Sequence, residues 1–357
     1  MDNSANDDYY EMSSDSKSIY PPADIVTYTE LRSVADLYRM HKEGDLDIQP
    51  AFQREEVWNH ANQTRFIDSL IKQLPIPSLC LSYDFSKQKW QVIDGLQRLT
   101  SAFNFLNISS DWRLSKLDDI DERISGVRTS EFETNPELKS LKKKVENTVL
   151  PITVLRCDWE NEQHQEYLFQ IFHRLNTGGI KLTNQEIRNC IYSGSLNNLL
   201  NELNASPMWI SISPFNKPTG YRFAGQEMIL RVYAFCSNYE SYSGRLSVFL
   251  NSFMRENRNL QESDINKMRQ LFFDMLSAAK PIINSDLKPN SKTVFEAMLV
   301  GIARNISSVK EKTDEEIIEC LRTMISSERF SKEGLSEGLS SKEKLTGRLS
   351  VACEAFR

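Results

Sequence analysis

The chain has 357 residues, enough for two or three domain-sized units, and its composition (40% hydrophobic, 26% charged) is typical of a folded globular protein. A net charge of −6 excludes a global basic field for nucleic acid, so any DNA contact has to come from a local patch. The six cysteines are scattered without a Cys-x-x-Cys pair, which argues against a zinc site or disulfide framework. No signal peptide or membrane-length apolar run is visible, so we expect a cytoplasmic protein without a membrane partner.

The first predicted elements are a disordered tail and a helix. Residues 1–20 are polar, serine-rich and acidic, a composition that cannot bury a core. Thr27 and Glu30 have the spacing of a capping box, and apolar residues at helical spacing follow as far as Tyr38. Gly44 is the expected stop.

An irregular segment comes next, at 47–58. Gln53 and Arg54 stand between two large anchors, Phe52 and Trp58, so a cationic fork is flanked by aromatic residues. The alternative for Arg54 is an ordinary surface salt bridge. A helix is then predicted at 62–73, ended by Pro75 and Pro77. Two strands follow, at 78–83 and 89–93.

The second of these strands leads into a polar elbow, Asp94-Gly-Leu-Gln-Arg98, and then into an apolar helix. Gly95 lets the backbone approach a ligand closely, and the first helical turn offers N–H groups and a positive dipole end. Arg98 falls in that turn, where it can bind phosphate bidentately. Asp94 can hold a magnesium ion or a polarised water. The alternative is a solvated turn with Asp94 as an ordinary N-cap.

The middle of the chain is predicted to be a connector followed by a helix pair. Residues 107–147 are charged and show little apolar periodicity, and their Lys142-Lys-Lys run is either solvated or a nucleic-acid contact. A strand resumes at 150–157. A later helix ends at Asn176-Thr-Gly-Gly179, and Thr183 with Glu186 caps the next one.

This second motif has two interpretations. A helix–loop–helix explains the glycines and the cap completely, but leaves the cluster of His173, Arg174, Asn176 and Thr177 unexplained. A ββα-metal nuclease would need more histidine and asparagine ligands, and the four histidines have no useful mutual spacing, so we reject it. From residue 191 to 357 the pattern is helical throughout, and Glu227 with Arg231 forms an expected i, i+4 ion pair.

In order and rhythm these motifs resemble the N-terminal domain of GmrSD-type (type IV) restriction enzymes, in the ParB/sulfiredoxin-like superfamily. The resemblance is carried by Phe52-Gln-Arg54…Trp58, Ile93-Asp-Gly-Leu-Gln-Arg-Leu-Thr100, Phe172-His-Arg-Leu-Asn-Thr-Gly178 and Glu227-x-x-x-Arg231. It implies an α+β fold, with a small mixed sheet and helices at 25–190 followed by an all-helical domain at 191–357. It also implies nucleotide binding and hydrolysis at the elbow. The residues implied are Gln53, Arg54, Asp94, Gly95, Gln97, Arg98, Asn176 and Thr177.

Two departures from the family pattern affect this expectation. Leu96 stands where the family usually has Gln, and a leucine cannot donate to a phosphate or base. If that side chain contacts nucleotide, hydrolysis is in doubt; if it faces the core, nothing is lost. Many relatives append an HNH nuclease domain, whereas the helical half here shows no metal-ligand cluster. The resemblance therefore implies a stand-alone sensor or switch, with cleavage supplied by a separate nuclease subunit.

Three hypotheses follow. The first is an NTP-binding and hydrolysing module of an anti-phage restriction system, with Asp94 and Arg98 catalytic, Asp94 on Mg²⁺, and Arg54 completing a charge clamp. The second is a non-catalytic domain that binds DNA or a partner protein in the same cleft. The third is a degenerate scaffold in a multi-protein system. Overall acidity favours a nucleotide over long DNA.

Overall fold

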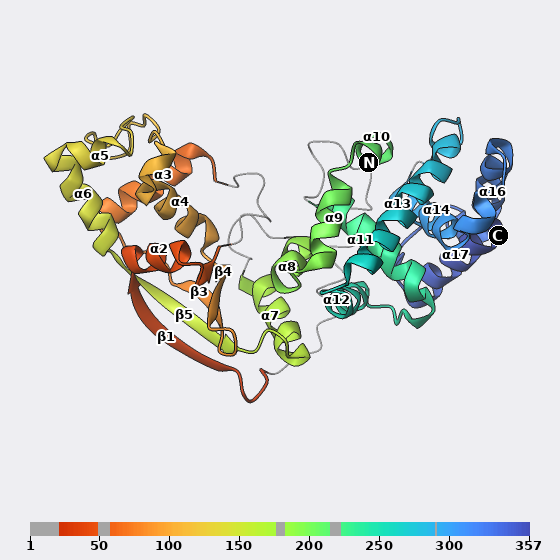
Figure 1. The fold of residues 1–357 in the computed structure, drawn as a ribbon, viewed down its shortest axis with the longest axis horizontal. Helices are drawn as coiled ribbons and strands as arrows, with labels where there is room; N and C mark the ends of the chain where they lie inside the picture. Colours follow the sequence, from red (N-terminus) through yellow and green to blue (C-terminus); the bar gives the residue numbers. More distant parts are fainter. Residues whose placement is uncertain (1–20, 49–57, 176–182, 215–222, 290) are drawn as a thin grey trace. The chain divides into compact units, whose positions relative to one another are not determined.

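The computed structural model describes residues 21–48, 58–175, 183–214, 223–289 and 291–357. The chain divides into two compact units, Ile19–Leu182 and Thr183–Arg357, which we describe separately (Figure 1). From the sequence we expected the boundary between the two units at residue 190. The expected tail at 1–20 lies outside the described residues.

The first unit is built on a five-stranded mixed sheet with strand order β1-β5-β3-β4-β2. β1 is antiparallel to β5, β5 is parallel to β3, β3 is antiparallel to β4, and β4 is parallel to β2. The strands are β1 (Val26–Ser33), β2 (Leu46–Asp47), β3 (Leu79–Asp84), β4 (Lys89–Asp94) and β5 (Val149–Cys157). A mixed sheet with helices confirms the α+β class.

One hydrophobic core joins the sheet to the helices from α2 to α6, and Figure 1 shows α2, α3, α4 and α6 gathered on one side of the sheet. The helices are α2 (Val34–Lys42), α3 (His60–Ile71), α4 (Leu96–Leu106), α5 (Glu131–Thr134), α6 (Pro136–Asn147) and α7 (Glu162–Leu175). A 3₁₀ turn, η2 (Ile108–Ser110), follows α4. The predicted helix at 62–73 and the strands at 78–83, 89–93 and 150–157 are confirmed to within a few residues.

The capping box predicted at Thr27 is wrong. Thr27 and Glu30 lie in β1, where Thr27 pairs with Leu155 of β5. The helix starts later, after Ser33, whose hydroxyl accepts a hydrogen bond from the Asp36 N–H at 3.1 Å. Pairing with a distant strand overrides the local pattern.

The connector predicted at 107–147 is also wrong, because this segment is part of the core. Its apolar side chains are buried, among them Leu114, Ile124, Phe132 and Leu141. Helix α6 contributes a buried strip at helical spacing, and its Lys142 forms an ion pair with Glu133. The charged residues of 107–147 therefore belong to a folded segment and not to a solvated linker.

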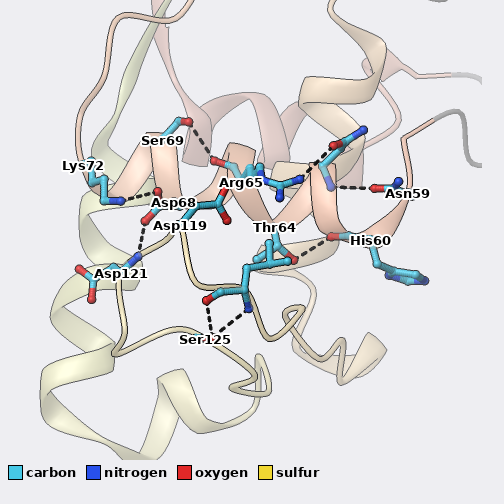
Figure 2. A network of polar contacts seen from close by, with 12 residues as sticks. Asn59, His60, Thr64, Arg65, Asp68, Ser69, Lys72, Asp119, Asp121 and Ser125 are labelled. Carbon is cyan, nitrogen blue, oxygen red and sulfur yellow. Dashed lines mark hydrogen bonds and ion pairs between the residues drawn. The ribbon is translucent and has the colours of Figure 1, made fainter.

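Polar side chains of α3 hold the loop that leads into this segment (Figure 2). Thr64 Oγ1 accepts from the Ser115 N–H at 2.9 Å, and the buried Asp68 carboxylate accepts from the Asp121 N–H at 2.9 Å. Arg65 forms an exposed ion pair with Asp119 at 2.8 Å. Thr64 and Asp68 thus supply acceptors to two backbone N–H groups of the loop.

The second unit is helical throughout its described residues. The capping box predicted at Thr183 and Glu186 is confirmed, and Thr313 with Glu316 forms a second one. The α-helices are α8 (Asn184–Ile191), α9 (Ser195–Asn204), α10 (Pro207–Ile212), α11 (Ala224–Asn238), α12 (Leu246–Glu256), α13 (Glu262–Ile283), α14 (Lys292–Arg304), α15 (Ile306–Val309), α16 (Asp314–Ser326) and α17 (Lys342–Ala355), with 3₁₀ turns η4 (Tyr239–Ser241) and η5 (Glu328–Phe330). In the described part of the chain, no helix combines the length and apolarity needed to cross a bilayer.

A buried ionic network lies inside this helical unit. The predicted Glu227–Arg231 pair is present at 3.9 Å, but both residues have closer partners. Glu227 Oε2 lies 3.0 Å from Nη1 of Arg188 on α8, whose side chain is 1% exposed. Arg231 forms its close ion pair with Glu296 of α14. Alternating charges thus tie α8, α11 and α14 together.

Candidate functional site

The elbow predicted between strand and helix is present, and a glycine makes it. Gly95 has φ +97°, in the left-handed region, and directly precedes α4 as its N-cap. A Cβ at this position would lie 2.2 Å from Cδ2 of the buried Leu79. Both the backbone conformation and the packing beneath it therefore require glycine. Gly95 itself is buried, and the Arg98 guanidinium lies beside it, with Nη2 3.1 Å from the position of an added Cβ.

The N-cap of α4 is Gly95, which has no side chain to cap the helix. Asp94 is the last residue of β4, so the alternative in which it is an ordinary N-cap is wrong. Its carboxylate, 38% exposed, accepts instead from Nη2 of Arg98 at 2.8 Å. The residue at the helix N-terminus thus supplies no side-chain acceptor, and a carboxylate and a guanidinium pair beside it.

Arg98 is held more tightly than a surface arginine. It also donates to the carbonyl oxygens of Pro77 and Ser78, and its side chain is 13% exposed. Burial lowers the pKa of Arg98 from its usual value and the Asp94 carboxylate opposes this, so the guanidinium remains a cation. Three acceptors fix the orientation of the Arg98 guanidinium, and an anionic ligand has to compete with Asp94 for this group.

The two residues between Gly95 and Arg98 have different roles. Leu96 is partly buried, and its side chain packs against the hydrophobic core. Gln97 Oε1 accepts from the Trp58 N–H at 3.2 Å. This bond brings the chain just before α3 to the elbow.

Four of the expected site residues cannot be placed. Gln53, Arg54, Asn176 and Thr177 lie outside the described residues. Of the expected set, the structure brings together Asp94, Gly95, Gln97 and Arg98 on β4 and α4.

Sequence reasoning missed the two carbonyl acceptors of Arg98. They belong to Pro77 and Ser78, at the end of the turn that leads into β3. The Pro75-x-Pro77 pattern indicates this turn in the sequence. Only the pairing of β3 with β4 shows that the turn lies beside the elbow.

A neighbouring thiol contributes no nucleophile. Cys80 pairs with Asp94 across the β3–β4 ladder and is buried. Burial, with a further contribution from the Asp94 charge, raises the pKa of Cys80 to about 12. The group stays a neutral thiol at physiological pH. Among the described residues, no group of three or more His, Cys, Asp or Glu side chains could hold a metal ion.

This α+β unit, with its strand–glycine–helix elbow, has the order of motifs expected for a restriction-enzyme domain. Residues 34–193 match the family model described as GmrSD restriction endonuclease, N-terminal domain. This part of the chain is therefore similar to a domain of restriction enzymes. No curated protein and no solved structure matches the chain.

Proposed function

We propose that the elbow binds the phosphates of a nucleoside triphosphate, and that the protein hydrolyses it as part of a restriction system. The observation that carries the proposal is the start of α4 at Gly95, followed within one helical turn by the cation Arg98. Backbone N–H groups at a helix N-terminus and a guanidinium are complementary to phosphate oxygens.

The Asp94–Arg98 pair gives this site two ligands of opposite charge. Phosphate takes the guanidinium, and the released Asp94 carboxylate takes Mg²⁺. Mg²⁺ is usually bound by one or two carboxylates together with substrate phosphates, so a single aspartate suffices here. In this scheme Asp94 orients the metal or the attacking water, and Arg98 stabilises charge on the transferred phosphoryl group.

The residues outside the described part of the chain complete the proposal. Arg54 precedes Trp58 closely in sequence, and Trp58 is bonded to Gln97 of the elbow. We therefore assign Gln53 and Arg54 to the phosphate clamp, and Asn176 and Thr177 to a further nucleotide contact. A separate nuclease subunit and foreign or modified DNA are the proposed partners.

The test is a thermal-shift and phosphate-release screen of the four NTPs with Mg²⁺. A ligand at one hundred times its Kd stabilises a fold by about 2.7 kcal/mol, which a thermal shift detects easily. We expect stabilisation and phosphate release in the wild type, and loss of both in Arg98→Ala. Arg65→Ala is the matched control, because it removes an exposed arginine of the same unit that lies outside the elbow.

Each other outcome has a defined meaning. Stabilisation without phosphate release contradicts turnover and leaves a nucleotide sensor. If no NTP shifts the wild type, the nucleotide proposal fails, and short DNA duplexes and single strands are tested next. DNA binding lost in Arg98→Ala would then support the alternative of a non-catalytic DNA-binding domain. The melting temperature of unliganded Arg98→Ala shows whether the variant is folded.

A further inference from the structure

The outer edge of the sheet is a long strand with exposed apolar side chains. β1 has eight residues and stands at the end of the strand order, paired on one side with β5. Among the described residues, no strand pairs with its other side. Leu31 is 69% exposed, the largest value among the exposed apolar residues of the described chain. Such an edge is a template for pairing with another strand.

The backbone direction along β1 follows from one hydrogen bond. The Val34 N–H donates to the Thr148 carbonyl, in the same register that pairs Arg32 with Leu150 and Glu30 with Ile152. Hydrogen-bonded and non-hydrogen-bonded pairs alternate in an antiparallel ladder. The backbone groups of the even-numbered residues therefore point to β5, and those of Thr27, Thr29, Leu31 and Ser33 point outward.

The side chains beside Leu31 form an apolar strip. Leu31 pairs with Pro151, and Ser33 pairs with Val149, which is 53% exposed. Directly opposite residues of a ladder lie on the same face of the sheet, so Leu31, Pro151 and Val149 share one face. Glu30 and Arg32 lie on the opposite face and bond to each other within the chain.

We propose that β1 pairs antiparallel with β1 of a second copy of this chain, about a twofold axis at Leu31. In this register Leu31 exchanges two backbone hydrogen bonds with Leu31 of the second copy. Thr29 pairs with Ser33 of the second copy. Glu30 lies opposite Arg32 of the second copy on the other face, and Arg32 lies opposite its Glu30. The two apolar strips meet around the axis and cover each other.

Charge selects this register over its neighbours. A shift of the axis to Glu30 places two glutamates opposite each other, and a shift to Arg32 opposes two arginines. Like charges directly opposite in a ladder are destabilising, whereas opposite charges stabilise it. With the axis at Thr29, neither Glu30 nor Arg32 lies opposite a residue of the opposite charge in the second copy. The β1 sequence is thus self-complementary about Leu31, and this selects a second copy as the occupant of the edge.

The first experiment measures mass by light scattering on the full chain and its charge variants. The wild type is expected to reach twice the monomer mass of 41.2 kDa as concentration rises. In Glu30→Arg an arginine at position 30 faces Arg32 of the second copy, and in Arg32→Glu a glutamate at position 32 faces its Glu30. Each variant alone is therefore expected to raise the dissociation constant of the dimer about tenfold or more. An equimolar mixture of the two variants restores both opposite-charge pairs and dimerises again as a heterodimer.

The second experiment tests the axis by crosslinking. Residues of a hydrogen-bonded antiparallel pair have Cα atoms about 5.5 Å apart, within the range of a disulfide. Leu31→Cys is therefore expected to form an intermolecular disulfide under mild oxidation. Thr27→Cys, on the same face and edge, is the matched control, because position 27 lies far from position 27 of the second copy in this register. Circular dichroism confirms that each variant is folded.

The outcomes decide the proposal. Recovery of the dimer in the mixed charge variants, with crosslinking at position 31 and not at 27, supports it. A wild type that stays monomeric at all concentrations overturns it. A dimer that survives both charge inversions, or that crosslinks at 27 rather than 31, also overturns it, because its contact is elsewhere. No outcome depends on nucleotide, so this proposal stands or fails apart from the proposed function.

Discussion

Arg98 and Asp94 are bonded across the glycine elbow, with 2.8 Å between Nη2 and the carboxylate. The cation that we assign to phosphate is therefore neutralised by its own chain in the absence of ligand. Binding of an anion at this site carries the cost of separating the pair, unless a cation takes the carboxylate at the same time. This relationship makes nucleotide and metal interdependent in the proposed mechanism.

The first prediction concerns Asp94→Asn, which removes the competing charge. We expect pyrophosphate without metal to bind the variant about tenfold more tightly than the wild type, because Arg98 no longer has to leave a carboxylate. Mg²⁺ should enhance binding to the wild type and leave the variant unaffected. Isothermal titration with and without Mg²⁺ measures both effects. Equal metal-free affinities in the two proteins would show that the ion pair does not control the site.

The second prediction concerns Gly95→Ala. A left-handed backbone costs a non-glycine residue about 1–2 kcal/mol, and overpacking against Leu79 adds about 1–3 kcal/mol. The control is Gly44→Ala in the same unit, where φ is +78° and nothing lies within 4 Å of the added Cβ. It should show the backbone cost alone. Urea denaturation followed by tryptophan fluorescence compares the two, and equal losses would contradict the packing argument.

The elbow could be predicted from sequence because its signals are local. A strand-forming run, a glycine and an apolar helical repeat follow one another between Trp90 and Leu106, and each signal lies within the element that it predicts. The side chain of Leu96 could not be assigned in this way. Whether it faced a ligand or the core depended on packing, and the structure places it against the core.

Other expectations failed because partners distant in sequence decide them. The capping-box spacing of Thr27 and Glu30 is compatible with a strand, and the pairing with β5 determines the outcome. In 136–147 the apolar strip at Leu138, Leu141 and Val145 has helical spacing, and the surrounding charge concealed it. Glu227, the carboxylate partner of the buried Arg188, lies on another helix, so no local sequence pattern predicts this pair.

The third prediction concerns that buried pair. Glu227→Ala leaves Arg188, 1% exposed, without its carboxylate, and removing one partner of a buried ion pair costs about 3–5 kcal/mol. Glu202→Ala in the same unit breaks the exposed pair with Arg269, where we expect about 1 kcal/mol or less. Hydrogen-exchange protection of α8 and α11 measures the loss within this unit. Similar losses in both variants would contradict the importance of burial.

The last prediction concerns acid stability. The Arg123 guanidinium hydrogen-bonds to the Asp121 carboxylate and lowers the pKa of Asp121 from 3.8 to about 2. Because the folded-state pKa is depressed, the stabilisation is fully present above pH 3.8 and is lost as pH falls toward 2. Several other carboxyl groups shift in the same direction, including Asp36, Asp119 and Glu133.

Urea midpoints measured at a series of pH values should therefore fall steeply between about pH 4 and 2 in the wild type. In Asp121→Asn the fall over this window should be smaller, because the variant has no carboxylate to protonate at this position. If Asp121→Asn also follows the wild type, the Asp121–Arg123 contact does not contribute to acid stability.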